Sequence, residues 1–269
     1  MKKILITGAN GYIGNSIENK LNMIEGKYDV SRLDVRTDNW KNNDFSYFDV
    51  VIHVAALVHI KESAYMESEY NKINKELSIE LADKAKNDGV KQFIFFSTMA
   101  IFGQVGLIGE KCTIDANTIP NPKTYYAKSK YEAEIELKKM ITDNFRIAII
   151  RPPMVYGPNC KGNFRKLESL AIKLFVFPLV DNERSMISIE RLTEEIISII
   201  NKHSQGVFMP QDNEYINIST LVKKLSESNG RKILLIKIPS FCIKIVGRNK
   251  PIFNKVFGNL TYAKDFKED

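Results

Sequence analysis

Two side chains at helical spacing are the strongest candidates for chemistry in this chain. Tyr126 and Lys130 lie four residues apart, so a helix would present their phenol and ammonium groups on one face. A phenol has an ordinary pKa near ~10, which a nearby cation lowers. Bringing the pKa of Tyr126 close to ~7 requires about 4 kcal/mol of differential stabilisation, of which Lys130 supplies a part. The pair is a candidate acid–base centre for a sugar or alcohol oxygen during hydride transfer.

The Tyr-x-x-x-Lys pattern is common on solvated helix faces, so it indicates an active site only together with other motifs. The first of these is a glycine turn. The turn lies between an apolar run at 3–7 and a predicted helix at 12–23. A strand–turn–helix of this kind aims backbone N–H groups at a pyrophosphate, although the first two glycines here are one residue further apart than in the commonest form. We therefore predict an NAD or NADP site at Gly8, Asn10, Gly11, Tyr12, Ile13 and Gly14.

Two charged residues after the second predicted strand bear on the choice of cofactor. Asp34 follows Gly14 by twenty residues, where an acid commonly accepts hydrogen bonds from the adenosine ribose. Arg36 would instead hold a 2′-phosphate. These two residues argue in opposite directions, so the sequence leaves NAD and NADP as alternatives.

Strand-like and helix-like runs alternate up to residue 151. The predicted strands are 3–7, 30–35, 49–56, 92–97 and 146–151, and the predicted helices are 12–23, 71–87 and 125–140. Such alternation predicts an α/β fold with a doubly wound parallel sheet of Rossmann type, covered on both faces. We assign residues 1–151 to this dinucleotide-binding domain.

The regular alternation of predicted strands and helices ends at residue 151. Helices are predicted at 164–175 and 190–201, and short strands at 207–209, 215–218 and 233–238. We expect residues 152–269 to form mainly a smaller substrate-binding lobe, packed on the first domain, from which a strand can return to the main sheet.

Composition narrows the class of protein. The net charge is +7, but the lysines are scattered, so no nucleic-acid partner is expected. The three cysteines and three histidines show no metal-ligand spacing, which predicts no metal site and a reduced, cytoplasmic setting. His53, inside an apolar strand, is expected to be structural. No apolar run approaches the ~20 residues that span a bilayer, so no membrane partner is expected.

Several segments together resemble the extended short-chain dehydrogenase/reductase family, which includes nucleotide-sugar epimerases, dehydratases and 4-ketoreductases. The resemblance covers nearly the whole chain. Its segments occur in the expected order: Thr7–Gly14, Val51–Ala56, Asn74, Phe95–Gly103, Tyr126–Lys130 and Arg151–Pro158.

The resemblance implies a role for each matching position. Tyr126 would be the acid–base residue, and Lys130 would bind the nicotinamide ribose and tune Tyr126. Thr98 would hydrogen-bond the reacting oxygen, with Ser97 as the fallback, and Asn74 would be structural or part of a polar relay. The other cofactor contacts implied are Ala55, Ala56, Ser97, Pro153 and Val155.

Two later segments, 161–164 and 182–186, look like the substrate-lobe motifs of enzymes that handle UDP-linked hexosamines in bacterial surface polysaccharide pathways. By this resemblance Arg184 would pair with the diphosphate, and Asn163 would contact the sugar or a phosphate. Family habit also suggests a homodimer formed through the helices at 71–87 and 125–140.

The resemblance leaves the direction of the reaction open. We expect an NAD(P)-dependent reductase of a UDP-4-keto-6-deoxy-hexosamine, because the 34–49 stretch is short and the lobe motifs resemble those of small reductases. A UDP-sugar 4-epimerase that retains NAD is the main alternative, and a non-catalytic dinucleotide-binding scaffold is a more distant one. A dehydratase is disfavoured because Met99 and Ala100, rather than an Asp-Glu pair, follow Thr98.

Overall fold

The centre of the protein is a six-stranded parallel sheet. A computed structural model describes residues 1–269 except 59–65, 161, 239–250 and 265–269. The sheet has the strand order β10-β6-β4-β3-β1-β2. Its strands are β1 (Lys2–Thr7), β2 (Tyr28–Leu33), β3 (Val50–His53), β4 (Gln92–Phe96), β6 (Arg146–Ile150) and β10 (Gly206–Phe208).

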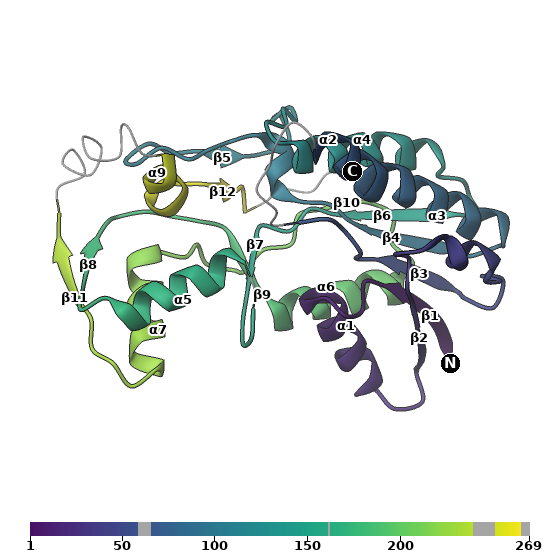
Figure 1. The fold of residues 1–269 in the computed structure, drawn as a ribbon, viewed down its shortest axis with the longest axis horizontal. Coiled ribbons are helices and arrows are strands. Elements are labelled where there is room, and N and C mark those ends of the chain that lie inside the picture. The colour runs from purple at the N-terminus through teal and green to yellow at the C-terminus, as the bar shows by residue number, and fades with distance from the viewer. Residues whose placement is uncertain (59–65, 161, 239–250, 265–269) are drawn as a thin grey trace.

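Helices cover both faces of this sheet (Figure 1). On one face lie α1 (Tyr12–Asn22) and α6 (Ile189–Lys202), and on the other lie α3 (Leu77–Asn87) and α4 (Tyr125–Lys139). A short helix, α2 (Glu67–Tyr70), and a π-helical turn at Asn71–Glu76 lead into α3. Single 3₁₀ turns occupy Asp38–Asn42 and Met99–Phe102.

Strand periodicity explains the two-sided burial. Ile4 and Ile6 of β1 pack on the side of α1 and α6, whereas Leu5 between them packs on the side of α3 and α4. Successive strand residues point to opposite faces, so a strand covered on both sides is apolar throughout. The doubly wound α/β sheet predicted from the sequence is thereby confirmed.

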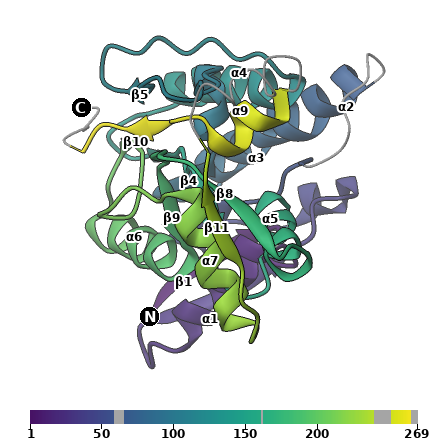
Figure 2. The same ribbon diagram turned by 90° about the vertical axis from the view of Figure 1, so that its left-hand side faces the viewer.

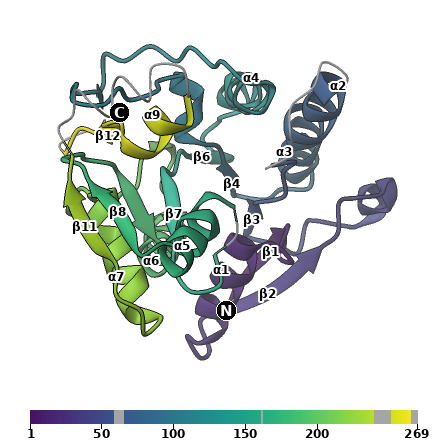
Figure 3. The same ribbon diagram turned by 60° about the vertical axis from the view of Figure 1, so that its left-hand side comes forward.

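The remaining elements form a smaller lobe beside the sheet (Figures 2 and 3). Two helices, α5 (Asn163–Lys173) and α7 (Ile218–Ser228), pack against each other and share an apolar core with α9 (Pro251–Phe257). Parallel strand pairs complete the lobe: β7 (Met154–Tyr156) with β9 (Met186–Ser188), and β8 (Val176–Leu179) with β11 (Leu234–Lys237). β12 (Thr261–Tyr262) pairs with β5 (Thr113–Ile114). No helix in the described ranges has the length and hydrophobicity to span a bilayer.

In the lobe, one predicted strand is the start of a helix. A strand was predicted at 215–218, but Ile216 makes only isolated bridge pairing, and α7 begins at Ile218. The side chain of Asn217 accepts a hydrogen bond from the Thr220 backbone N–H at 3.0 Å and caps the helix. The Asn-Ile-Ser-Thr segment is therefore a helix start, because an N-cap amide satisfies an otherwise unpaired N–H group.

Candidate active site

The predicted cofactor residues converge because the strands are parallel and their carboxyl ends meet at one edge of the sheet. Gly8, just after β1, lies against the chain that follows β3. Its φ is +74°, and a Cβ atom there would lie 2.5 Å from the Ala55 nitrogen. A side chain at position 8 would therefore clash with backbone that cannot yield, which explains the glycine.

The amino end of α1 presents unsatisfied N–H groups at the same edge. Gly11 is its N-cap and provides no side-chain hydrogen bond. Gly14 packs so closely that a Cβ atom would lie 2.5 Å from the Gly8 carbonyl oxygen. Tyr12 and Ile13 start the helix and are half-buried. An uncapped helix start with close-packed glycines is suited to a phosphate group.

Helix α4 carries Tyr126 and Lys130 to this edge. The Thr124 hydroxyl caps α4 by accepting a hydrogen bond from the Ala127 N–H at 3.2 Å. Tyr126 is half-buried, and a hydrogen bond joins its phenol to the side chain of Thr98. Lys130 is only 1% exposed, and its Nζ has no hydrogen-bond partner among the described residues. The structure therefore brings together the three residues to which the family resemblance gives catalytic roles.

The charges of this pair differ from the expectation based on spacing. Burial raises the pKa of Tyr126 to about 12, against a lowering by the hydrogen bond from Thr98. Burial also lowers the pKa of Lys130 to about 7, with Glu134 acting in the opposite direction. In the protein alone, desolvation is the main influence on both groups and favours their neutral forms.

This burial predicts a stability effect at Lys130. An unfolded lysine has a pKa near ~10.4, so between pH 7 and pH 10 the unfolded state binds more protons and stability rises with pH. Lys130→Met should raise the free energy of unfolding of the cofactor-free protein by on the order of 3 kcal/mol at pH 7, and by less as the pH approaches 10. Urea denaturation at several pH values measures this. The exposed Lys138→Met is the control, and destabilisation by Lys130→Met at every pH would contradict the prediction.

Asp34 and Arg36, just after β2, are paired with each other. The Asp34 carboxylate accepts hydrogen bonds from both the backbone N–H and the guanidinium of Arg36, which lowers the pKa of Asp34 to about 2. A second arginine, Arg32, was missed by the sequence reasoning. It donates to the Glu18 carboxylate at 2.6 Å and to Asn10 Oδ1 at 3.3 Å, beside the glycine turn. Both arginines near the adenosine end are thus neutralised by carboxylates.

A buried ion pair supports the site and was also missed. Arg151 donates to the Glu134 carboxylate, with Nη2 at 2.7 Å from Oε2, and both side chains are almost fully buried. Ser97 donates its hydroxyl to the same carboxylate. This leaves Thr98, rather than Ser97, as the hydroxyl beside Tyr126. The available sequence signal was the position of Glu134, four residues after Lys130 on the same helix face.

A second buried polar network joins β1, β3 and α4. His53 is hydrogen-bonded through both ring nitrogens, to Thr7 at 2.7 Å and to Ser78 at 2.9 Å, as expected of a structural histidine. Asn74, in the π-helical turn, accepts from the Leu57 N–H at 2.7 Å and donates to Ser129 Oγ at 3.3 Å. Asn74 therefore fastens the chain that follows β3 to the helix that carries the Tyr/Lys pair.

The other predicted site residues lie either at the carboxyl edge of the main sheet or in the lobe. Ala56, like Ala55, follows β3, while Pro153 and Val155 follow β6 at the carboxyl edge. Arg184 belongs to the lobe, where its Nη1 donates to the Gly258 carbonyl at 2.9 Å and burial lowers its pKa.

The predicted substrate segment at 161–164 is described only in part. Lys161 lies outside the described residues. Asn163 begins α5, and its side chain also lies outside the described part of the structure.

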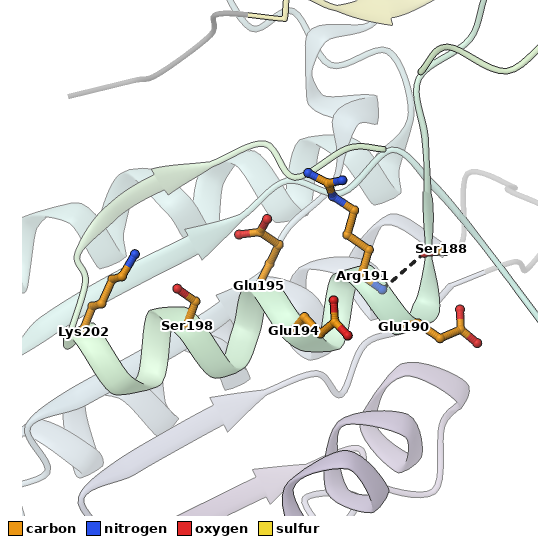
Figure 4. Close-up of a pocket in the computed structure, with 7 residues that line it drawn as sticks. All are labelled: Ser188, Glu190, Arg191, Glu194, Glu195, Ser198 and Lys202. Carbon is orange, nitrogen blue, oxygen red and sulfur yellow. Dashed lines mark hydrogen bonds between the residues drawn. The ribbon is translucent and has the colours of Figure 1, made fainter. Parts of the chain in front are cut away.

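Two surface depressions are separate from this site. One, of about 600 Å³, follows α6 and is lined by Ser188 and side chains of that helix (Figure 4). The other, of about 680 Å³, includes Arg146 at the amino end of β6 and His203 after α6. Neither is lined by Tyr126, Lys130 or Thr98. Ligands of open α/β sheets bind at the carboxyl ends of the strands, so we place the active site there.

Comparison with protein families and curated sequences identifies relatives that cover most of the chain. A model described as the NAD dependent epimerase/dehydratase family matches residues 4–182. A UDP-glucose 4-epimerase of Vibrio cholerae is 29% identical and covers 92% of this chain and 82% of its own length. The N-acetyl-alpha-D-glucosaminyl-diphospho-ditrans,octacis-undecaprenol 4-epimerase of Escherichia coli O157:H7 is 24% identical, covering 95% of this chain and 81% of its own.

Solved structures with the same fold include enzymes of two kinds. A dTDP-4-dehydrorhamnose reductase of Clostridium acetobutylicum superposes with a TM-score of 0.70 at 22% identity, covering 88% of this chain and 83% of the other. The UDP-glucuronic acid 4-epimerase of Bacillus cereus, solved in complex with NAD, gives a TM-score of 0.71 at 19% identity, with 97% and 89% coverage.

Proposed function

This chain belongs to the NAD dependent epimerase/dehydratase family, and on that basis we propose that it is an NAD-dependent 4-epimerase of a nucleotide-diphosphate sugar. The observation that carries the proposal is the half-buried Tyr126 phenol, which is hydrogen-bonded to Thr98. The helix of Tyr126 also carries Lys130, whose buried Nζ has no hydrogen-bond partner in the described part of the chain. The curated relatives that span more than nine-tenths of the chain are 4-epimerases, which favours epimerisation over reduction.

The described residues fit a dinucleotide. Lys130 Nζ is a buried donor with no partner in the described chain, which suits it to bind ribose hydroxyls. The uncapped amino end of α1 and the close packing of Gly8 and Gly14 suit the pyrophosphate. The carboxyl ends of β1, β3, β4 and β6 lie side by side at one edge of the sheet.

In the mechanism we propose, the side chains of this chain manage the proton at the sugar oxygen. A dinucleotide held by the glycine turn and Lys130 would supply the hydride acceptor and donor for C4. Tyr126 would remove the proton from the C4 hydroxyl as C4 is oxidised, and would return it to the same oxygen when the carbonyl is reduced from its opposite face, while Thr98 hydrogen-bonds that oxygen. Because the pKa of Tyr126 is about 12 in the protein alone, a positive charge beside the phenol must favour its ionised form.

We propose that the lobe formed mainly by residues 152–269 holds the nucleotide-diphosphate part of the substrate. The guanidinium of Arg184 donates one N–H to Gly258, and its planar fork carries further donors that suit a diphosphate. Asn163 is proposed as a sugar or phosphate contact. β10, from the second half of the chain, pairs with β6 of the main sheet.

We further propose that NAD is preferred over NADP. Arg32 and Arg36 are engaged by Glu18 and Asp34, and the Asp34 carboxylate would repel a 2′-phosphate. Asp34→Asn should therefore tighten NADP binding by about tenfold, with a smaller change for NAD. Isothermal titration with both dinucleotides measures this. Asp38→Asn, an exposed acid in the next turn, is the matched control. Unchanged NADP affinity would contradict the proposed role of Asp34.

The test of the function compares cofactor use with sugar interconversion. Purified protein is incubated with UDP-glucose, with UDP-N-acetylglucosamine and with the same sugar on diphospho-undecaprenol, using catalytic NAD. A 4-epimerase converts each accepted sugar to its C4 epimer with no net change in NADH absorbance. The proposal would be overturned if none of these sugars were epimerised and the protein instead oxidised NADH stoichiometrically when given a UDP-4-keto sugar.

That opposite outcome corresponds to a second candidate, a reductase of a UDP-4-keto-6-deoxy-hexosamine. Two observations favour it: the stretch from Asp34 to Asp49 is short, and the solved reductases share the fold over nearly the whole chain. Hydride would then pass from NADH or NADPH to C4, and Tyr126 would donate the proton.

A further inference from the structure

The strand pair β8 and β11 lies at the end of the lobe (Figure 2), and several of its apolar side chains are exposed. Their parallel register pairs Val176 with Leu234 and Pro178 with Ile236, so these four side chains share one face. Val176, Leu234 and Ile236 are 47%, 62% and 44% exposed. Phe177, on the opposite face, packs into the lobe core. The outer face therefore has apolar residues at positions where polar side chains would be expected.

Apolar residues beside the strands extend this surface. Phe175 is 76% exposed, and the Leu234 N–H donates to its carbonyl at 2.8 Å, which places Phe175 next to the strand pair. We call Phe175, Val176, Pro178, Leu234 and Ile236 the β8–β11 face. Of the fifteen large hydrophobic side chains exposed in the described ranges, four belong to this face. Such concentration marks an interaction surface, because exposed apolar residues are ordinarily scattered.

The two segments that form the β8–β11 face carry basic residues, and the nearest acidic residues along the chain are Glu168, Asp181 and Glu227. Residues 170–180 and 230–238 contain Lys173, Arg231, Lys232 and Lys237 and no acidic residue. All four basic side chains are exposed. Arg231 donates to the Ile172 carbonyl at 2.9 Å, which holds the start of the second segment against the end of α5. The apolar face thus has a basic margin.

We propose that the β8–β11 face docks on the surface of a lipid bilayer that contains anionic lipids. Apolar side chains enter the boundary between head groups and acyl chains, while neighbouring lysine and arginine residues contact anionic head groups. A second copy of the chain fits this face less well, because a two-fold contact would bring the basic margins of both copies together. The expectation of no membrane partner rested on the lack of a spanning segment, which does not bear on surface docking.

The position of this face is compatible with catalysis on the docked protein. β8 and β11 lie at one end of the molecule, whereas β1 and β2 lie at the other (Figure 1). Docking through the β8–β11 face therefore places the main sheet away from the bilayer. The inference stands independently of which sugar the enzyme uses.

Co-sedimentation with vesicles tests the apolar part of the proposal. We expect the full chain to bind vesicles of phosphatidylcholine containing phosphatidylglycerol, and to bind pure phosphatidylcholine vesicles at least tenfold more weakly. Phe175→Ser combined with Leu234→Thr should lower partitioning at least tenfold, with an unchanged circular dichroism spectrum and thermal midpoint. Ile119→Ser, which removes an 81% exposed hydrophobic residue elsewhere, is the matched control and should bind like the parent chain.

A charge variant tests the basic margin. Lys173→Gln combined with Lys232→Gln should weaken partitioning by roughly 30-fold, which corresponds to about 1 kcal/mol for each charge, and added salt should reduce the difference. Lys72→Gln combined with Lys138→Gln is the control for net charge. Absence of vesicle binding, or equal binding by parent and both variants, would overturn the proposal. So would a dimer, seen by light scattering, that the Phe175 and Leu234 changes dissociate without affecting vesicle binding.

Discussion

Replacing Tyr126 with phenylalanine is expected to lower kcat for the sugar reaction by about 10²- to 10⁴-fold, the range for loss of a positioned acid–base group. The change removes the hydroxyl that hydrogen-bonds Thr98 but keeps the ring, which packs against Tyr70 with 6.4 Å between centroids. The affinity for NAD should stay within a few-fold of the parent value. Steady-state rates and isothermal titration with NAD measure the two quantities.

The neighbouring tyrosine provides a matched control for this experiment. Tyr125 begins α4 but has no lysine four residues later, so Tyr125→Phe should leave kcat within a few-fold of the parent value. If Tyr126→Phe kept most of the activity, or if both variants lost it equally, Tyr126 would not be the acid–base residue. Loss of NAD binding by Tyr126→Phe alone would instead assign the phenol to the cofactor site.

The largest stability effect is expected from Arg151→Met. Removing one member of a buried, hydrogen-bonded ion pair leaves the other charge without compensation, which costs about 3–5 kcal/mol. The Glu134 side chain is 1% exposed, and Ser97 would be its remaining hydrogen-bond donor among the contacts described above. Urea denaturation should show a lower midpoint with an unchanged slope.

A double substitution separates the ion pair from simple packing loss. Glu134→Leu with Arg151→Met removes both charges, so it should recover at least half of the stability lost in Arg151→Met. The exposed Arg165→Met serves as the control for removing an arginine. If the double variant were as unstable as the sum of the single variants, the uncompensated charge would not be the cause.

The local features of the site were predictable because their physics is local. The backbone of the glycine turn passes so close to its neighbours that there is no room for a Cβ atom at Gly8 or Gly14. The Tyr126 and Lys130 spacing requires only a helix, which α4 provides. The alternating apolar runs predicted the parallel sheet. In the lobe, however, the segment predicted as a strand at 215–218 is the start of α7, which Asn217 caps.

The properties that depend on distant residues were not predictable in this way. The spacing indicated that Lys130 would lower the pKa of Tyr126, but burial by surrounding elements raises it to about 12. Arg32 of β2 pairs with Glu18 of α1, and Arg151, just after β6, pairs with Glu134 of α4. No local pattern indicates such pairings, since each joins elements whose distance is set by packing.

The sequence by itself thus determined the fold class, the glycine turn and the candidate acid–base pair, because hydrophobic period, turn geometry and helical spacing act over a few residues. The tertiary structure decided which charges are paired, which hydroxyl stands beside Tyr126 and which apolar surface of the lobe stays exposed. Those outcomes depend on desolvation and on contacts between residues far apart in the chain. They depend on how β1, β3, β4 and β6 are ordered in the sheet and on how the lobe packs.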